Sequence, residues 1–420
     1  MNEIPWEPWT DGAFERARAE GKPVLLHIGA TWCHWCHVMD QGTYPHPEVI
    51  RLVRERFVAV RVDTDHRPDV NERYNQGGWP TCAVLDADGE VLVGRLYMPP
   101  HELIPLLLST STPGQRWVIG KAAADVMPEA PADVAAIAAA VKKGFDPWHG
   151  GFGELEKFPH TAVCEWLLDR QQRGVPLPGD GAGMLGKTLD AMAAPGLYDP
   201  VDGAFFRYTT RDDWQVPHYE KLLDDNARLL RLYARAGGHR GNVEGSVTWL
   251  LRHLWTGAAF KGSMDADEGF YNEDFAPGPG GFGRASGHPA VDPSVYAGWN
   301  ALAATAMLRA SAMLGRPGLA GVARITMDSV RTLVAPGGFV SRLSGGQAGL
   351  LDEQAHVAEG AIAVGAWTGN DAWLDLAACV VSWADEHLRL PVGYRDATGG
   401  GVGLLRHARR PLHGNAALGE

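Results

Sequence analysis

Two cysteines separated by two residues, Cys33 and Cys36, constrain the fold of this chain more than any other feature. A short apolar run, 23–28, has the length and composition of a strand and leads through Gly29 towards the pair. Cys33 is therefore expected at the start of a helix, where unpaired backbone N–H groups and the helix dipole favour a thiolate. The spacing predicts a redox pair. Cys33 is the nucleophile, with a pKa below the ~8.5 of a free thiol, and Cys36 is the resolving thiol.

Three other interpretations of this stretch remain open. Cys33, Cys36 and His37 also spell C-x-x-C-H, the haem attachment pattern, but residues 1–9 show no signal peptide that would export the chain. The two thiolates with His34 or His37 resemble a zinc ligand set, although a second C-x-x-C motif is absent from the sequence. The third alternative is a pair of buried, inert cysteines. The residues expected to support the redox site are His34, Trp35, His37 and Trp79.

The residues after the motif favour the redox interpretation. We expect a second strand at 57–63, a short helix at 67–74, a third strand at 81–86 and an edge strand at 90–93. Pro80 precedes the third strand, and because an X-Pro bond accepts the cis form at modest cost, we expect a cis Trp79-Pro80 bond beside the thiols. Pro80 is therefore grouped with the two cysteines as a catalytic residue. The pattern predicts a thioredoxin-like α/β domain.

Composition limits the partners and the compartment. The 420 residues are 45% hydrophobic and 21% charged, which is enough for two cores. A net charge of -12 argues against nucleic acid, and the chain has no apolar run of the ~18 residues that suggests a membrane span. The five cysteines suit a reducing compartment, so we expect a cytoplasmic protein.

The second part of the chain has the pattern of a helical repeat. From residue 122, Ala- and Leu-rich helical stretches alternate with loops in which an aromatic residue follows glycine. These loops are 150–152, 203–205, 269–271, 337–339 and 393–394. Repeated αα-hairpins predict a toroid, with domains at 1–112 and 113–420. A sixth loop would fall beyond Glu420, so we expect an open toroid that self-associates or accepts a C-terminal segment in the gap.

A string of motifs runs through nearly the whole chain. It comprises residues 21–23, 33–39, 61–63, 67–69, 77–80 and 97–100, followed by 150–153, 157–159, 207–208, 214, 216–221, 225–226, 265–267 and 299–300. On these residues the sequence resembles the spermatogenesis-associated protein 20-like family. The resemblance implies a thioredoxin-like domain fused to an (α/α)6 barrel related to N-acylglucosamine 2-epimerase-type toroids.

Polar and aromatic side chains gather on the predicted hairpin loops, most densely between residues 207 and 226. The candidate barrel pocket comprises Arg207, Tyr208, Trp214, His218, Glu220, Lys221, Asp225, Asn226, Asp265, Asp267, Asn300 and His356. Aromatic platforms beside ionisable groups suit a sugar-like ligand. A hydrolase would use two of the carboxylates, and an epimerase would use an acid/base pair such as His218 with His356. Helix capping and packing between repeats are the structural alternative for the same set.

Two functions follow. The first is a thiol-disulfide oxidoreductase that acts on protein thiols or disulfides with a reductase partner, the barrel binding the substrate. The second is a carbohydrate-binding or sugar-modifying barrel with a redox-sensing domain. A scaffold without turnover is a third. No metal or other cofactor is expected for any of them.

Overall fold

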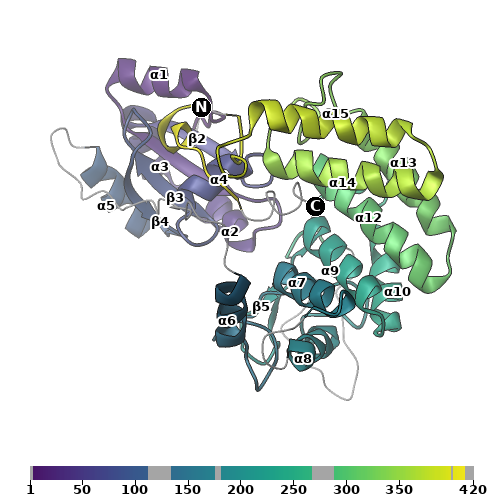
Figure 1. The fold of residues 1–420 in the computed structure, drawn as a ribbon. Coiled ribbons are helices and arrows are strands. Elements are labelled where there is room, and N and C mark those ends of the chain that lie inside the picture. Colours follow the sequence, from purple (N-terminus) through teal and green to yellow (C-terminus); the bar gives the residue numbers. More distant parts are fainter. Residues whose placement is uncertain (1–2, 112–133, 176–180, 267–287, 399–400, 412–420) are drawn as a thin grey trace. The chain divides into compact units, whose positions relative to one another are not determined.

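The computed structural model describes residues 3–111, 134–175, 181–266, 288–398 and 401–411. These residues form two compact units, which we describe separately (Figure 1). Unit 1 is drawn from Met1–Met127 and Arg395–Pro411, and unit 2 from Pro128–Tyr394 and Leu412–Glu420.

Unit 1 is built on a four-stranded sheet with the strand order β2-β1-β3-β4. The strands are β1 (Val24–Gly29), β2 (Val58–Asp63), β3 (Thr81–Leu85) and β4 (Val91–Arg95). β1 runs parallel to β2 and antiparallel to β3, and β3 runs antiparallel to β4. The predicted thioredoxin-like α/β fold is therefore confirmed.

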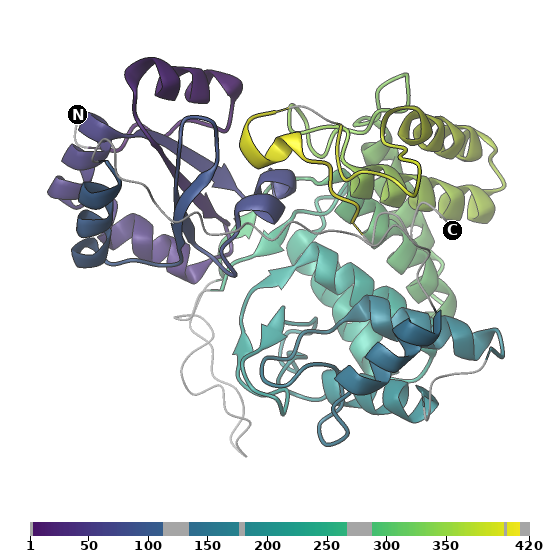
Figure 2. The same ribbon diagram turned by 60° about the vertical axis from the view of Figure 1, so that its left-hand side comes forward.

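Side chains alternate between the two faces of this sheet and create two apolar cores. Leu25 belongs to one core, with residues of α2, α3 and α5, whereas its neighbours Val24 and Leu26 belong to the other, with residues of α1 and α4. The resulting layers can be followed in Figure 2. The helices are α1 (Asp11–Glu20), α2 (His34–Gly42), α3 (Pro47–Arg56), α4 (Pro68–Tyr74) and α5 (Pro100–Thr110).

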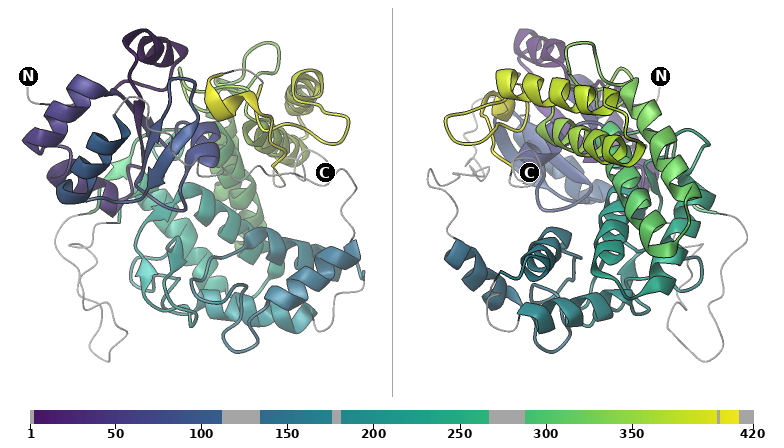
Figure 3. Two further views of the ribbon diagram at one scale, coloured as in Figure 1. Left: turned by 90° about the vertical axis from the view of Figure 1, so that its left-hand side faces the viewer. Right: turned by 45° about the vertical axis from the view of Figure 1, so that its right-hand side comes forward.

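Unit 2 is a succession of helical hairpins. Its long elements are α6 (Val134–Gly144), α7 (Thr161–Gln172), α8 (Gly181–Ala193), α9 (Leu223–Ala236), α10 (Arg240–Trp249) with the π-helical turn η1 (Leu250–Leu254), α12 (Ala297–Leu314), α13 (Gly318–Arg331), α14 (Leu351–Thr368) and α15 (Ala372–His387). Helices α7, α9, α12 and α14 lie side by side in that order, and each contacts the helix that follows it in the chain. The right-hand view of Figure 3 shows the hairpins placed around an arc.

The loops between hairpins share one construction. Isolated antiparallel bridges close them at Phe145 with Phe152, Tyr198 with Phe205, Trp255 with Phe260, Val334 with Val340, and Arg389 with Tyr394. Four of the predicted glycine-aromatic loops coincide with these bridges. The fifth predicted loop, 269–271, lies outside the described residues, and the loop at Trp255 was not predicted. Short strand pairs complete the connections: β5 (Tyr208–Thr209) with β6 (Pro217–His218), and β7 (Lys221–Leu222) with β8 (Ser263–Met264) and β9 (Val291–Asp292).

The segment Arg395–Pro411, assigned from sequence to the helical domain, belongs to unit 1. Arg73 donates to both carboxylate oxygens of Asp396, at 2.6 and 3.1 Å, and both side chains are buried. The backbone N–H of Leu404 donates to the Tyr74 hydroxyl at 2.8 Å. These contacts join residues that are more than three hundred positions apart, which local sequence patterns cannot reveal.

Gly403, the first residue of η2 (Gly403–Arg406), provides a test of this attachment. Its φ is 63°, and a Cβ here would overlap the Tyr74 hydroxyl and lie 2.5 Å from the carbonyl oxygen of Gly89. We expect Gly403→Ala to release the segment and to raise hydrogen exchange at residues 401–411 by at least ~10-fold, the factor that corresponds to about 1.4 kcal/mol.

Gly21→Ala is the matched control. Gly21 has nearly the same φ, 62°, but no atom lies within 4 Å of its Cβ position. Both variants carry the same backbone strain, so the difference between them isolates the steric overlap. Equal exchange at residues 401–411 in the two variants would contradict the close approach of Gly403 and Gly89.

Candidate functional site

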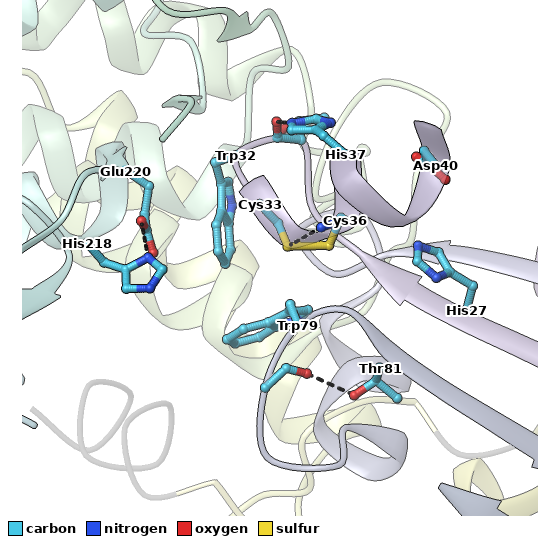
Figure 4. The surroundings of a disulfide bond; sticks show 12 residues. His27, Trp32, Cys33, Cys36, His37, Asp40, Trp79, Thr81, His218 and Glu220 are labelled. Carbon is cyan, nitrogen blue, oxygen red and sulfur yellow. Dashed lines mark hydrogen bonds and ion pairs between the residues drawn. A yellow bond between two sulfur atoms is a disulfide. The ribbon is translucent and has the colours of Figure 1, made fainter. Parts of the chain in front are cut away.

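The two cysteines lie where β1 connects to α2. β1 ends at Gly29, and Cys33 is the N-cap of α2 with an extended backbone conformation. Cys33 and Cys36 form a disulfide with their Cα atoms 5.2 Å apart, and the N–H of Cys36 donates to the sulfur of Cys33 at 3.2 Å (Figure 4). The strand-to-helix position predicted for the pair is confirmed. It places the Cys33 sulfur at the N-terminus of a helix, where backbone N–H groups and the helix dipole favour a thiolate.

Aromatic residues flank the disulfide. The rings of Trp32 and Trp79 meet edge to face at 5.3 Å, and Figure 4 shows both beside the sulfurs. Trp32 is held by a 2.6 Å hydrogen bond to Asp65, and the Trp79-Pro80 bond is cis, as predicted. Trp32 and Asp65 were not selected from the sequence, since nothing local links them.

The two histidines of the motif differ in their surroundings. A ring nitrogen of His37 lies 3.0 Å from the carbonyl oxygen of Thr31, so this side chain braces the turn before the helix. The rings of His34 and Trp35 meet edge to face at 5.5 Å, and Trp35 also contacts Tyr97 at 5.0 Å. His37 therefore contacts the turn before the helix, whereas His34 packs against the exposed Trp35.

His27 is a buried polar residue that sequence analysis missed. It lies in β1, and its Nδ1 is 2.8 Å from the Tyr44 hydroxyl. A Cβ at Gly29 would lie 2.8 Å from His27 Nε2 and 3.4 Å from the sulfur of Cys36, so only glycine fits between them. Burial, together with the charge of Arg61, lowers the pKa of His27 to about 3, and the imidazole is neutral near pH 7. The presence of a histidine inside the apolar run 23–28 could have indicated this buried polar residue from the sequence.

The thiols of Cys82 and Cys164 are unsuited to exchange chemistry. Burial raises the pKa of each to about 12, and the hydrogen bond between Cys82 and Tyr44 opposes this effect only in part. Neither is a thiolate near pH 7. Of Cys33, Cys36, Cys82 and Cys164, only the pair at the start of α2 is therefore placed for chemistry that needs a thiolate.

Part of the predicted barrel pocket forms a real cluster in unit 2. The carboxylate of Glu220 is buried and lies 3.2 Å from Arg207 and 3.1 Å from Nδ1 of His218. Burial opposes ionisation, but His218 and Arg207 outweigh it and lower the pKa of Glu220. Burial and the neighbouring Asp224 raise the pKa of Asp225 to about 7. Glu220, which precedes α9, and Asp225, in the first turn of α9, thus have opposite pKa shifts.

Tyr208 is not free to act as a platform for a ligand. Phe158 stacks on one side at 4.5 Å with an interplanar angle of 9°, and His218 stacks at 4.7 Å with an angle of 12°. Flat stacking by two different rings occupies the ring faces of Tyr208. The three side chains form a column that positions His218 against Glu220.

Other predicted pocket residues hold loops together. The amide oxygens of Asn226 and Asn300 accept from Phe205 and Phe260, at 2.8 and 2.7 Å, so each closes one bridged loop. The buried Lys221 ammonium lies 2.6 Å from Asp199. Trp214 is buried and donates to the carbonyl oxygens of His149 and Gly150, Asp265 follows β8, and Asp267 lies outside the described residues.

A cavity of about 840 Å³ is enclosed by α7, α9, α12 and α14. His356 is the predicted pocket residue that lines it, and the cluster around Glu220 does not. Arg228, Arg231 and Arg235 follow one another along one face of α9 and also line the cavity. The spacing of these three arginines, which places them on one face of a helix, is the sequence pattern that could have indicated this site.

Two features are absent from the described residues. No group of three or more His, Cys, Asp and Glu side chains there is arranged to hold a metal ion. No helix in the same part of the chain combines the length and the hydropathy needed to cross a bilayer.

Residues 1–111 match the family model Thioredox_DsbH, described as a protein of unknown function, DUF255. Spermatogenesis-associated protein 20 of Homo sapiens is 32% identical over 317 residues, which cover 63% of this chain and 39% of that protein. The uncharacterized protein B0495.5 of Caenorhabditis elegans is 31% identical over 263 residues, covering 56% of this chain and 36% of that protein. The chain thus spans less than half the length of these relatives.

Shorter and structural similarities were also found. The thiol:disulfide interchange protein DsbD of Pseudomonas fluorescens is 31% identical over 81 residues, covering 19% of this chain and 14% of that protein. A structure titled DsbH Oxidoreductase has a TM-score of 0.24 at 20% identity, covering 26% of this chain and 83% of its own. The crystal structure of D-mannose isomerase has a TM-score of 0.46 at 12% identity, covering 64% of this chain and 75% of its own. The chain combines a thioredoxin-like unit with a unit of helical hairpins. Over 63% of its length it is similar to spermatogenesis-associated protein 20, as its motifs predict.

Proposed function

We propose that this protein is a thiol-disulfide oxidoreductase in which Cys33 is the nucleophile and Cys36 the resolving thiol. The observation that supports this best is the disulfide at the N-terminus of α2, where the Cys33 sulfur already accepts a backbone N–H. The similarity of part of the chain to a protein named thiol:disulfide interchange protein also supports it.

The proposed reaction is thiol-disulfide exchange. In the reduced protein, the Cys33 thiolate attacks a substrate disulfide, forms a mixed disulfide and expels the second substrate sulfur as a thiolate. Cys36 loses its proton and attacks the Cys33 sulfur, which closes the Cys33–Cys36 disulfide and releases the first substrate sulfur. Two electrons pass to the substrate, and the two protons lost by the cysteines are balanced by the two that the substrate thiolates take up.

A reductase must return two electrons to the pair after each cycle. The proposed partners are therefore protein disulfides as substrates and a dithiol or flavin-dependent reductase, with the cytoplasm as the proposed compartment. Unit 2 is the proposed docking element for the protein substrate. In the reverse direction, the same cysteines would oxidise protein thiols.

Replacing Cys36 by serine tests this function. We expect Cys36→Ser to accumulate mixed disulfides through Cys33, because the thiol that resolves them is lost while the nucleophile remains. The adducts would be measured by non-reducing electrophoresis and mass spectrometry after mild oxidation with a disulfide-containing protein such as insulin. They should disappear on addition of dithiothreitol.

Two variants control for adducts formed elsewhere. Cys33→Ser/Cys36→Ser should form none, whereas Cys36→Ser/Cys379→Ser should form as many as Cys36→Ser, since Cys379 lies in α15 of the other unit. The assignment would be contradicted if trapping required Cys379. It would also be contradicted if no adduct formed although Cys33 was shown to be reduced.

A second candidate, sugar binding or modification in unit 2, is favoured by one observation. Glu220 and Asp225 have pKa values shifted in opposite directions, the pattern of a carboxylate paired with a proton donor. A ligand-observed NMR screen with mono- and disaccharides would test it. We expect Asp225→Asn to abolish any binding found. Binding that survives this change, or no binding by the unchanged protein, would contradict this candidate.

A further inference from the structure

The cavity between α7, α9, α12 and α14 has a charge opposite to that of the whole protein. Five arginines line it, namely Arg173, Arg228, Arg231, Arg235 and Arg309. The lining carboxylates are Glu165, Asp169 and Glu359. The chain as a whole carries a net charge of -12. Arginines therefore outnumber acids in a cavity of about 840 Å³, large enough for a sugar-sized molecule.

The lining carboxylates are already engaged. Arg231 lies between two of them, at 2.7 Å from Glu165 and 2.6 Å from Glu359. Although burial alone would raise the pKa of Glu359, His356 and Arg231 lower it to about 2, so it stays ionised and paired. Asp169 lies 2.9 Å from Arg173. Asp169 also lies 3.7 Å from Arg235, and Arg228 pairs with Asp224 at 2.9 Å, so four of the five arginines have carboxylate partners and Arg309 has none within the described residues.

One charged hydrogen-bond donor of the cavity lacks an acceptor in the part of the chain that the structure describes. Arg309, on α12, is exposed and makes no hydrogen bond or ion pair with any residue that the structure describes. His356 is only 5% exposed, and its Nε2 accepts from Arg228 at 3.2 Å, which places its proton on Nδ1. That Nδ1 faces the Glu359 carboxylate at 3.7 Å, so His356 is engaged by lining residues at both ring nitrogens. The Arg309 guanidinium is therefore the cation of this cavity without a counter-ion among the described residues, and it could bind an anion with charge-assisted hydrogen bonds.

Two tryptophans add an apolar surface to the same cavity. Trp166 on α7 and Trp367 on α14 are both lining residues, and Trp367 is 52% exposed. Indole rings bind the apolar face of a ring-shaped ligand, while guanidinium groups bind carboxylate or phosphate with two parallel hydrogen bonds. We propose that this cavity binds a sugar-sized anion, a ring with a carboxylate or phosphate substituent. The proposal does not depend on the redox function.

Isothermal titration calorimetry with three matched probes tests this site. Glucuronate carries a carboxylate, glucose 6-phosphate carries a phosphate, and glucose carries neither. We expect one or both anions to bind at least ~10-fold more tightly than glucose, and the affinity to fall with added salt. Whichever anion binds more tightly identifies the substituent. Glucose binding equal to that of both anions, or no binding by either anion at millimolar concentration, would overturn the proposal.

Variants place the binding in the cavity. Arg309→Gln should weaken binding of the anion at least ~10-fold, the loss that a charge-assisted hydrogen bond predicts, without lowering the melting temperature. Arg324→Gln is the control, because Arg324 lies on α13 in an exposed pair with Asp328. The Cys33→Ser/Cys36→Ser protein should bind as the unchanged protein does. Equal loss in Arg309→Gln and Arg324→Gln, or none in Arg309→Gln, would contradict the assignment.

Discussion

Lys221→Met is expected to lower the free energy of unfolding of unit 2 by about 3 to 5 kcal/mol. The ammonium of Lys221 and the carboxylate of Asp199 are both fully buried and lie 2.6 Å apart. The same ammonium donates to the carbonyl oxygen of Gly203 at 2.9 Å. Removing it leaves the buried Asp199 carboxylate with the backbone N–H groups of Val201 and Asp202 but without this counter-ion, and a buried charge without its counter-ion is strongly destabilising. Urea denaturation measures the change in the free energy of unfolding, and hydrogen exchange at residues 197–226 locates it in the chain.

Arg324→Gln is the matched control for removal of one member of an ion pair. Arg324 and Asp328 are 47% and 49% exposed, and breaking such a pair costs no more than about 1 kcal/mol. A Lys221→Met protein as stable as the unchanged protein would contradict a structural role. It would return Lys221 to the candidate ligand-binding residues predicted from the sequence.

Unit 1 is expected to lose stability in acid because of His27. The folded protein holds this imidazole neutral down to about pH 3, whereas in the unfolded chain it accepts a proton below ~6.5. Between these values the unfolded state binds more protons, so stability falls as the pH falls. The slope from His27 alone approaches about 1.4 kcal/mol for each pH unit, and the full stabilisation is present above pH 6.5.

His27→Gln should remove this contribution, because the amide does not titrate and still offers a partner to the Tyr44 hydroxyl. Urea unfolding of the oxidised protein at several pH values between 4 and 7 measures the slope. His101→Gln is the control, since the His101 side chain is 79% exposed. If the slope of His27→Gln equals that of the unchanged protein, the buried neutral imidazole is contradicted.

The disulfide and its surroundings show how far local sequence patterns can predict a site. Cys33, Cys36 and the cis Trp79-Pro80 bond were all predicted, because a strand-to-helix junction and an X-Pro turn are encoded by neighbouring residues. His27 was missed because an apolar run gives no indication of what each side chain faces. The cavity arginines were missed because a row of arginines on a helix is ordinarily a solvated surface.

The sequence by itself determined the sheet of unit 1, the position of the cysteine pair and four of the bridged hairpin loops, since periodicity and turn residues act over a few positions. Only the tertiary structure decided which polar residues remain for chemistry. Lys221 and Asp199 are 22 positions apart, and Arg73 and Asp396 are 323 apart. Folding brings such charges together out of water, where each requires its partner, and polar side chains that are not engaged in this way are left to bind a ligand.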